Sequence, residues 1–278
     1  MSADAPGVAL PVALIAGGPV RLDLHADGVA HLRLNRPEAA NGLDLELLTV
    51  LHGAVEQIDA DARVRAVLLS GEGAHFCAGG DVRRFAAQGE NLPDYIRPAT
   101  AELAAVATGL MQLRAPVLAA VQGYAAGGGG MGLVCSADLV IAAESAQFLC
   151  GATRVAMVPD AGVSVTLAKL VGLRKAMELL LLNPTLTAAQ ALEIGLVNRI
   201  VPDANLAEES LALARRLASG APLALAATKR LVWAGVAGEP AAAMLEENRL
   251  QAILSGTADA REGLAAVIEK RSPRFTGR

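Results

Sequence analysis

The spacing of apolar residues predicts the first elements of the chain. Between residues 20 and 35, the stretch VRLDLHADGVAHLRLN alternates apolar and polar positions around Asp27 and Gly28, which is typical of a β-hairpin. Residues 43–59 carry apolar side chains at helical spacing. Residues 64–71 form a short apolar run that ends in glycine and indicates a buried strand. The chain therefore begins with a hairpin, a helix and a further strand.

Strands and helices alternate through the middle of the chain. The pattern predicts, in order, a turn into a helix after 75–81, a helix over 99–114, a strand over 115–123, a helix opened by the glycines after residue 126, short strands over 139–145 and 146–150, and helices over 161–172 and 173–183. From Thr187 onward the pattern is mostly helical, with one short strand at 195–201. This alternation predicts an α/β fold with a parallel sheet, followed by a helical tail that packs on the core or on a neighbour.

Composition excludes several classes of protein. Of the 278 residues, 53% are hydrophobic and 19% are charged, which is typical of a globular chain. The net charge of −4 argues against a surface that binds nucleic acid. The three cysteines form no CxxC pair, so we expect neither a disulfide framework nor a metal site, and we expect a cytoplasmic protein.

Two uncharged segments raise the question of a membrane. Residues 5–20 follow an acidic flank, contain Pro11 and lack a basic region before them, so a signal peptide is not expected. Residues 115–137 are long enough to span a bilayer, but they hold six glycines and divide into a strand-like and a helix-like part. We interpret this second segment as buried core.

The glycine run GGGGMG fits three interpretations. It matches the dinucleotide-binding pattern at Gly127, Gly129 and Gly132, but Asp138 and Glu144 come too early to be the acid that binds the ribose. Glycine also allows close packing of a helix against another backbone. The third interpretation is that bare N–H groups at a helix N-terminus face an oxygen that becomes anionic.

A second glycine turn favours the third interpretation. HFCAGGD, at residues 75–81, also follows a predicted strand and enters a predicted helix. Two such turns on neighbouring strands would each offer one N–H to a single oxygen. The sequence therefore predicts an oxyanion hole.

These segments, with others along the chain, resemble the crotonase superfamily, also called the enoyl-CoA hydratase/isomerase family. The matching motifs occur in the family's order and cover nearly the whole chain: LNRPEAANGLD (34–44), FCAGGDV (76–82), PVLAAVQGYAAGGGGMGLVCSADLVIA (116–142), AQF (146–148), VPDAG (158–162), LTAAQALEIGLVNRIV (186–201), APLALAATKRLV (221–232) and EKRSPRFTG (269–277).

The resemblance implies a fold and an assembly. Members of the family coil ββα units into a right-handed superhelix and use a C-terminal helical region for trimerisation, and hexamers built as dimers of trimers are usual. We expect an N-terminal extension over 1–19, a crotonase core over 20–203 and the helical region over 204–278. The resemblance also implies acyl-CoA substrates, with coenzyme A as part of the substrate and no separate cofactor.

By motif position, the resemblance implies that the N–H groups of Ala78 and Gly128 hold the thioester oxygen. The family's hydratases place two glutamates where this chain has Met131 and Ala152, and neither a thioether nor a methyl group transfers protons near pH 7. Several isomerases that resemble this chain carry a single acid at the position of Asp160. The alternative is that Asp160 is only the N-cap of the following helix.

Further positions match the family's coenzyme A contacts. Residues Glu38, Ala39 and Ala40 match the loop that contacts adenine, Gly80, Asp81 and Val82 follow the first glycine turn, and Lys270 and Phe275 match a C-terminal element that often reaches across from an adjacent subunit. Asp81 also fits a charge at a helix N-terminus. Lys229 is either a phosphate contact or a solvated helix lysine, Cys77 fits a small buried residue, and His75 fits a structural role.

The preferred function is an acyl-CoA isomerase that shifts a double bond or rearranges an unsaturated or epoxidised acyl-CoA, of the Δ3-Δ2-enoyl-CoA or epoxyphenylacetyl-CoA type. A single carboxylate suits this reaction, because one group can remove a proton and return it at another carbon. The alternatives are an enoyl-CoA hydratase, an acyl-CoA binder with little catalysis, and an aryl-CoA dehalogenase with Asp160 as its nucleophile. The dehalogenase's tryptophan falls at Ala152, and its histidine has no counterpart.

Overall fold

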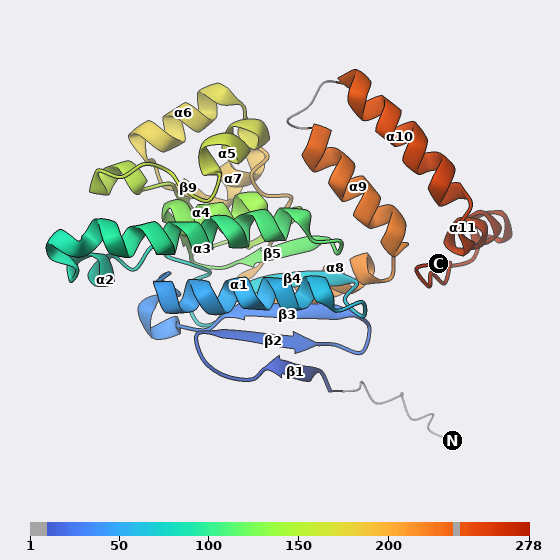
Figure 1. Ribbon diagram of the computed structural model, residues 1–278, viewed down its shortest axis with the longest axis horizontal. Coiled ribbons are helices and arrows are strands. Elements are labelled where there is room, and N and C mark those ends of the chain that lie inside the picture. Colours follow the sequence, from blue (N-terminus) through green and yellow to red (C-terminus); the bar gives the residue numbers. More distant parts are fainter. Residues whose placement is uncertain (1–9, 236–239) are drawn as a thin grey trace.

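A seven-stranded sheet runs through the computed structural model, which describes residues 10–235 and 240–278 (Figure 1). Its strand order is β1-β2-β3-β4-β5-β7-β10, with antiparallel pairing from β1 to β3 and parallel pairing from β3 to β10. These strands span Val12–Ile15, Val20–Leu24, Val29–Leu34, Ala66–Gly71, Val117–Val121, Leu139–Ala143 and Arg199–Val201. A smaller sheet pairs β6 (Tyr124–Ala126), β8 (Gln147–Leu149) and β9 (Leu186–Thr187) in the order β6-β8-β9.

Helices surround the two sheets. The α-helices are α1 (Leu45–Ala60), α2 (Val82–Ala86), α3 (Leu92–Gln112), α4 (Gly127–Ser136), α5 (Val163–Val171), α6 (Leu173–Leu182), α7 (Ala188–Glu193), α8 (Leu206–Ala218), α9 (Pro222–Gly235), α10 (Pro240–Ser255) and α11 (Ala258–Glu269). Short 3-10 turns are η1 (Pro37–Ala39), η2 (Gly89–Asn91), η3 (Ala152–Val155) and η4 (Asp203–Asn205). The predicted α/β class with a largely parallel sheet is confirmed.

The first predicted elements form as their patterns indicate. Strands β2 and β3 pair as an antiparallel hairpin, and the alternation buries Val20, Leu22 and Leu24. Helix α1 buries one apolar face, and Asp44 caps it by accepting a hydrogen bond from the N–H of Leu47 at 2.9 Å. The hairpin and α1 therefore follow from local spacing and capping.

In the first half of the chain, three features differ from the sequence prediction. Strand β1 lies within the predicted N-terminal extension and pairs with β2. Helix α3 begins at Leu92, seven residues before the predicted start, and runs through Pro98. Strand β6 was not predicted, because three residues beside the glycine run are too short to show a period.

The uncharged segment 115–137 lies within the fold and supplies β5, β6 and α4. Every residue of β5 is buried, and so is most of α4. Within the residues that the structure describes, no helix is long and apolar enough to cross a membrane. The interpretation of this segment as core is confirmed.

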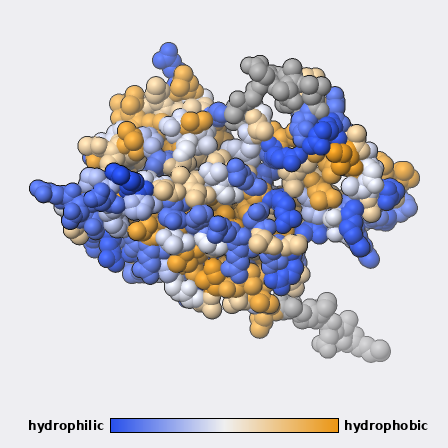
Figure 2. Space-filling view, viewed as in Figure 1, coloured by the Kyte–Doolittle hydropathy of each residue, from blue (hydrophilic) through white to orange (hydrophobic). Residues whose placement is uncertain are grey.

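Apolar side chains also remain at the surface. Figure 2 shows them gathered over α6 and near α11 at the C-terminal end. The exposed residues are Leu173, Met177, Leu181 and Leu182 on α6, and Leu264, Val267 and Ile268 on α11. Patches of this kind on a folded chain mark contact surfaces.

Lys229 anchors the C-terminal helices to the core. Its ammonium lies 2.8 Å from a carboxylate oxygen of Asp138 and donates to the carbonyl of Leu110 at 2.7 Å, and its side chain is only 5% exposed. Asp138 also accepts from Nε1 of Trp233 at 2.7 Å. Burial lowers the pKa of Lys229, while Asp138 opposes that shift. Both earlier interpretations of Lys229, a phosphate contact or a solvated lysine, are therefore wrong.

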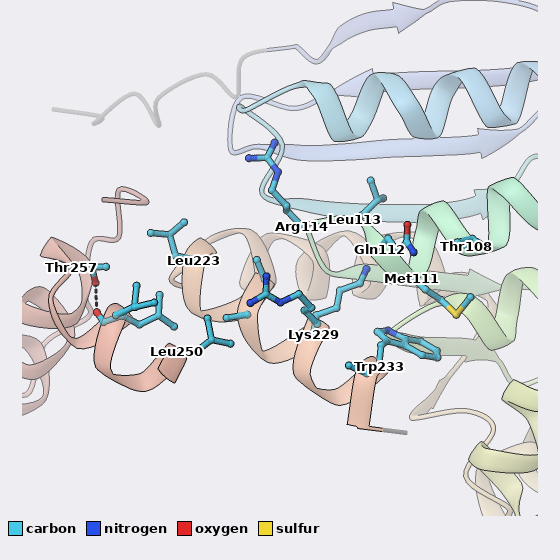
Figure 3. A pocket seen from close by; sticks show the side chains of 16 residues that line it. Thr108, Met111, Gln112, Leu113, Arg114, Leu223, Lys229, Trp233, Leu250 and Thr257 are labelled. Atoms are coloured by element: carbon cyan, nitrogen blue, oxygen red, sulfur yellow. Dashed lines mark hydrogen bonds between the residues drawn. The ribbon is translucent and has the colours of Figure 1, made fainter. Parts of the chain in front are cut away.

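A pocket of about 850 Å³ lies beside this anchor, between the end of α3 and helices α9 and α10. Figure 3 shows Lys229 and Trp233 of α9 reaching toward Met111 and Leu113. The anchor therefore fixes α9 against the core, and α10 packs against α9 and lines another wall of the pocket (Figure 1).

We expect Lys229→Met to lower the free energy of unfolding by about 3 kcal/mol, because it leaves the Asp138 carboxylate without its cation partner. Two hydrogen-bond donors remain on Asp138, which sets the cost at the lower end of the range for a broken buried pair. Urea unfolding measures the change. The matched control is Lys175→Met, whose exposed pair with Glu178 should contribute less than about 1 kcal/mol. Equal losses in both variants would contradict the anchoring role.

Candidate functional site

Two glycine turns lie backbone to backbone at the centre of the site. The turn that follows β4 runs beside β6, where the N–H of Cys77 donates to the carbonyl of Tyr124 at 3.0 Å and the N–H of Ala126 donates to the carbonyl of Cys77 at 2.8 Å. A Cβ on Gly79, whose φ is +91°, would stand 2.6 Å from the carbonyl oxygen of Ala126. Glycine is therefore required for the two turns to meet.

Each turn leaves N–H groups without a backbone acceptor among the described residues. Helix α4 begins at Gly127, so the N–H of Gly128 in its first turn has no partner within the helix. Among the described residues, the N–H of Gly80 has no acceptor either. The nitrogen of Gly80 lies 3.7 Å from the point where a Cβ on Gly127 would stand. A free donor of the first turn therefore lies where the two turns meet, near the start of α4 and the positive end of its dipole.

The structure contradicts the prediction that Ala78 supplies one of these donors. The N–H of Ala78 donates to the carbonyl of Ala40 at 3.0 Å and so holds the η1 loop against the turn. Gly80, two residues further on, carries the free N–H. Counting along the motif could not distinguish these residues, because the difference lies in the direction of each N–H and not in the side chains.

Asp160 lies directly against Gly128. Its carboxyl carbon stands 2.7 Å from the position of a Cβ on Gly128, and its Oδ1 stands closer still. This oxygen is buried and has no hydrogen-bond partner in the part of the chain that the structure describes. Burial raises the pKa of Asp160, and a bond to its own backbone N–H opposes the shift. The half-buried carboxyl group of Asp160 thus lies against the start of α4, with one oxygen that has no partner in the described residues.

The alternative role of Asp160 as a helix cap is not supported. The N-cap of α5 is Gly162, and no side chain caps this helix end. Asp160 contributes only its backbone carbonyl, which accepts from the N–H of Val163 at 3.0 Å. Its side chain is therefore available for another purpose.

The two positions at which the family's hydratases carry glutamates lie on α4 and η3, close to the glycine run. Met131 belongs to α4 and is buried with 1% of its surface exposed. Ala152 is half-buried and begins η3, directly after Gly151. Gly151 in turn lies close to Gly127, with 3.9 Å between the position of its Cβ and the Gly127 nitrogen.

A cleft of about 590 Å³ adjoins the Gly80 donor, between η1 and α2. Six residues that the sequence predicts as substrate contacts line this one cleft: Glu38, Ala39, Ala40, Gly80, Asp81 and Val82. Arg83 and Arg84 also line it, and sequence reasoning did not select them. The signal was present in DVRRF, where two arginines directly follow the glycine turn. The cleft therefore combines bare backbone with positive charge, which suits a phosphate-bearing ligand.

Asp81 organises the cleft through its charge. Its carboxylate accepts from the N–H of Arg84 at 3.1 Å and so caps α2. The guanidinium of Arg36 lies 3.3 Å from Asp81 and 3.0 Å from Asp44. The predicted position at a helix N-terminus is confirmed, and the carboxylate is already paired.

Lys270 and Phe275 do not line this cleft in their own chain. Lys270 ends α11 with φ at 55°, and the ring of Phe275 packs near Gly263 of that helix. Figure 1 shows α11 and the C-terminus at the opposite end of the molecule from α2. Only a neighbouring subunit could bring these two residues to the cleft.

Cys77 and His75 have structural roles. Cys77 is fully buried, and burial raises the pKa of its thiol to about 12, so it is not a nucleophile near pH 7. Nδ1 of His75 accepts from the N–H of Tyr124 at 3.2 Å. Among the described residues, no group of three His, Cys, Asp or Glu side chains is arranged to hold a metal ion.

Comparisons with known proteins agree with this geometry. The sequence model of the enoyl-CoA hydratase/isomerase family matches residues 25–278. A probable enoyl-CoA hydratase of Rhodobacter capsulatus is 39% identical over 91% of this chain and 96% of its own length. The 1,2-epoxyphenylacetyl-CoA isomerase of Escherichia coli is 35% identical over 90% of this chain and 96% of its own length.

Solved structures show the same fold. The enoyl-CoA hydratase of Bacillus anthracis superposes with a TM-score of 0.89 and 34% identity, covering 94% of this chain and 100% of that one. A putative enoyl-CoA hydratase/isomerase of Mycobacterium abscessus gives a TM-score of 0.88 at 30% identity, covering 93% of this chain and 100% of that one. The predicted crotonase fold is confirmed, and the chain belongs to the enoyl-CoA hydratase/isomerase family, whose members act on acyl-CoA thioesters.

Proposed function

We propose that this protein is an acyl-CoA isomerase, which moves a double bond or rearranges an unsaturated or epoxidised acyl group. One observation carries the proposal: the carboxyl group of Asp160 lies against Gly128, and its buried Oδ1 has no partner in the described residues. A thioester held by the N–H groups of Gly80 and Gly128 would have its acyl carbons within reach of this carboxylate.

The chemistry then needs one acid/base group. Asp160 removes the proton next to the thioester carbonyl, and the electron pair of that C–H bond moves onto the thioester oxygen as an enolate. The two N–H groups stabilise this oxyanion, and a single such donor is typically worth about 10²–10³ in rate. The protonated Asp160 returns the proton at the far carbon of the allylic system. Its raised pKa suits both steps, because the group must accept a proton and then release it.

The cleft between η1 and α2 is proposed to hold coenzyme A. Arg83 and Arg84 would face its phosphates, and the backbone around Ala39 and Ala40 would face adenine. Asp81 stays paired with Arg36 and shapes this cleft without touching the reacting atoms.

A hydratase is the second candidate, because the relatives from Rhodobacter capsulatus and Bacillus anthracis carry that name. Water addition by two carboxylates would need acids where this chain has Met131 and Ala152. The isomerase is therefore preferred.

We also propose that the chain assembles as a trimer or as a dimer of trimers. The exposed apolar residues of α11 need a covering surface, and Lys270 and Phe275 do not line the cleft between η1 and α2 of their own chain. Light scattering should give a trimer or hexamer at micromolar concentration, and Phe275→Ala should weaken coenzyme A binding. A stable monomer would contradict the assembly.

Asp160→Asn should lower kcat by about 10²–10⁴ with little change in coenzyme A affinity, because the amide keeps the size of the side chain but accepts no proton. Steady-state kinetics with a panel of unsaturated acyl-CoA thioesters measures this loss. As a gain-of-function control, Met131→Glu combined with Ala152→Glu should raise hydration of crotonyl-CoA from near zero. Strong hydratase activity in the unmodified protein that survives Asp160→Asn would favour the second candidate.

The pH profile gives an independent reading of the same assignment. A general base must be ionised, so kcat/KM should fall as pH drops through the pKa of Asp160 in the free enzyme. Because burial raises this pKa, the acid limb should lie above the range of an ordinary aspartate. A kcat/KM that stays constant as the pH falls to the pKa range of an ordinary aspartate would argue against Asp160 as the general base.

The choice of Gly80 over Ala78 can be tested with a bound thioester. In a crystal structure with a non-reactive acyl-CoA analogue, we expect the thioester oxygen within hydrogen-bonding distance of the Gly80 and Gly128 nitrogens. The N–H of Ala78 should remain on the carbonyl of Ala40. An oxygen bound by Ala78 would restore the prediction made from the motif.

A further inference from the structure

An aromatic ring stands beside the Gly80 donor. Cε2 and Cζ of Phe85 lie 2.5 and 2.6 Å from the point where a Cβ on Gly80 would stand, so the ring edge occupies the place of a side chain there. Phe85 belongs to α2 and is only half-buried. The ring therefore lies beside the backbone of the residue whose N–H is the proposed donor.

A second ring braces the first. The centroids of Phe85 and Tyr95 are 6.0 Å apart at an interplanar angle of 63°, which is an edge-to-face contact. The hydroxyl of Tyr95, on α3, accepts from the N–H of Leu45 at the start of α1, at 3.2 Å. Three helices thus fix the orientation of the pair before any substrate arrives.

Aromatic residues are scarce in this chain, which makes their position informative. The sequence holds four Phe, two Tyr and one Trp. Phe76 and Phe148 are fully buried in the core. Phe85 and Tyr95 instead remain partly accessible at the edge of the first glycine turn, where their rings are available to a ligand.

We propose that Phe85, braced by Tyr95, selects the acyl group, and that the site prefers acyl groups with an aromatic ring close to the thioester over short linear chains. A third ring can add an edge or offset contact to the existing pair, whereas a linear chain gains only apolar contact area. This inference rests on the proposed function, because it requires the thioester oxygen to bind at Gly80 and Gly128.

The test compares two thioesters, phenylacetyl-CoA and hexanoyl-CoA, by calorimetry on the full-length protein, with coenzyme A itself as the reference ligand. The unmodified protein should bind phenylacetyl-CoA about 3- to 10-fold more tightly than hexanoyl-CoA. Phe85→Leu keeps an apolar side chain but removes the ring, and should bring this ratio close to one. Tyr95→Phe keeps both rings and should retain the ratio. If Phe85→Leu does not fold, Phe85→Met replaces it.

The inference is overturned if the unmodified protein shows no preference, or if Phe85→Leu leaves the ratio unchanged. A separate measurement tests the proposed function independently of Phe85. It follows the exchange of the protons next to the thioester carbonyl with deuterated water, in the unmodified protein and in Asp160→Asn. If exchange depends on Asp160 but Phe85→Leu leaves the affinity ratio unchanged, the role of Phe85 is rejected and the proposed function stands. Exchange that is equally fast in the unmodified protein and in Asp160→Asn would reject the proposed function itself, because another group would then be the base.

Discussion

The site depends on the direct contact of two backbone turns. Gly79 meets the carbonyl of Ala126, and a Cβ on Gly130 would collide with the carbonyl of Cys77. Any side chain at these points would separate the strand end after β4 from the start of α4. The free N–H groups of Gly80 and Gly128 would then no longer lie together, and one oxygen could not receive both. The absence of side chains at these glycines thus allows the site to form, and the surrounding helices hold it in place.

Asp160 is held between two opposing electrostatic effects. The N-terminus of α4 favours a negative charge beside Gly128, whereas burial of the carboxyl group disfavours it. Burial dominates, so the pKa is raised. No arginine or lysine pairs with this carboxylate among the described residues, in contrast to Asp81 and Asp138, which are both neutralised. The difference separates two paired acids that maintain the fold from Asp160, to which we assign the proton transfer.

Much of this arrangement could be predicted from sequence. Periodicity located the hairpin and α1, the alternation of strands and helices indicated a parallel sheet, and two glycine turns indicated a pair of N–H donors. The order of the strands in the sheet was not predicted. The donor in the first turn was placed two residues early, because only the backbone path shows that the N–H of Ala78 is already bonded. Lys229 was missed as an anchor for a related reason. A lysine on a helix gives no sign in sequence that residues 110–115 and Asp138, about a hundred residues earlier in the chain, will converge on it.

The close contact of Asp160 with Gly128 has a consequence for how this site can evolve. A side chain at position 128 would occupy the space of the carboxyl group, so the two positions cannot vary independently. A descendant that first loses the carboxylate can afterwards accept a larger residue at 128. To regain the acid at position 160, the lineage would first have to restore glycine at position 128. That first change gives no advantage by itself. Loss of this chemistry is therefore easy for a lineage, whereas recovery requires two ordered changes.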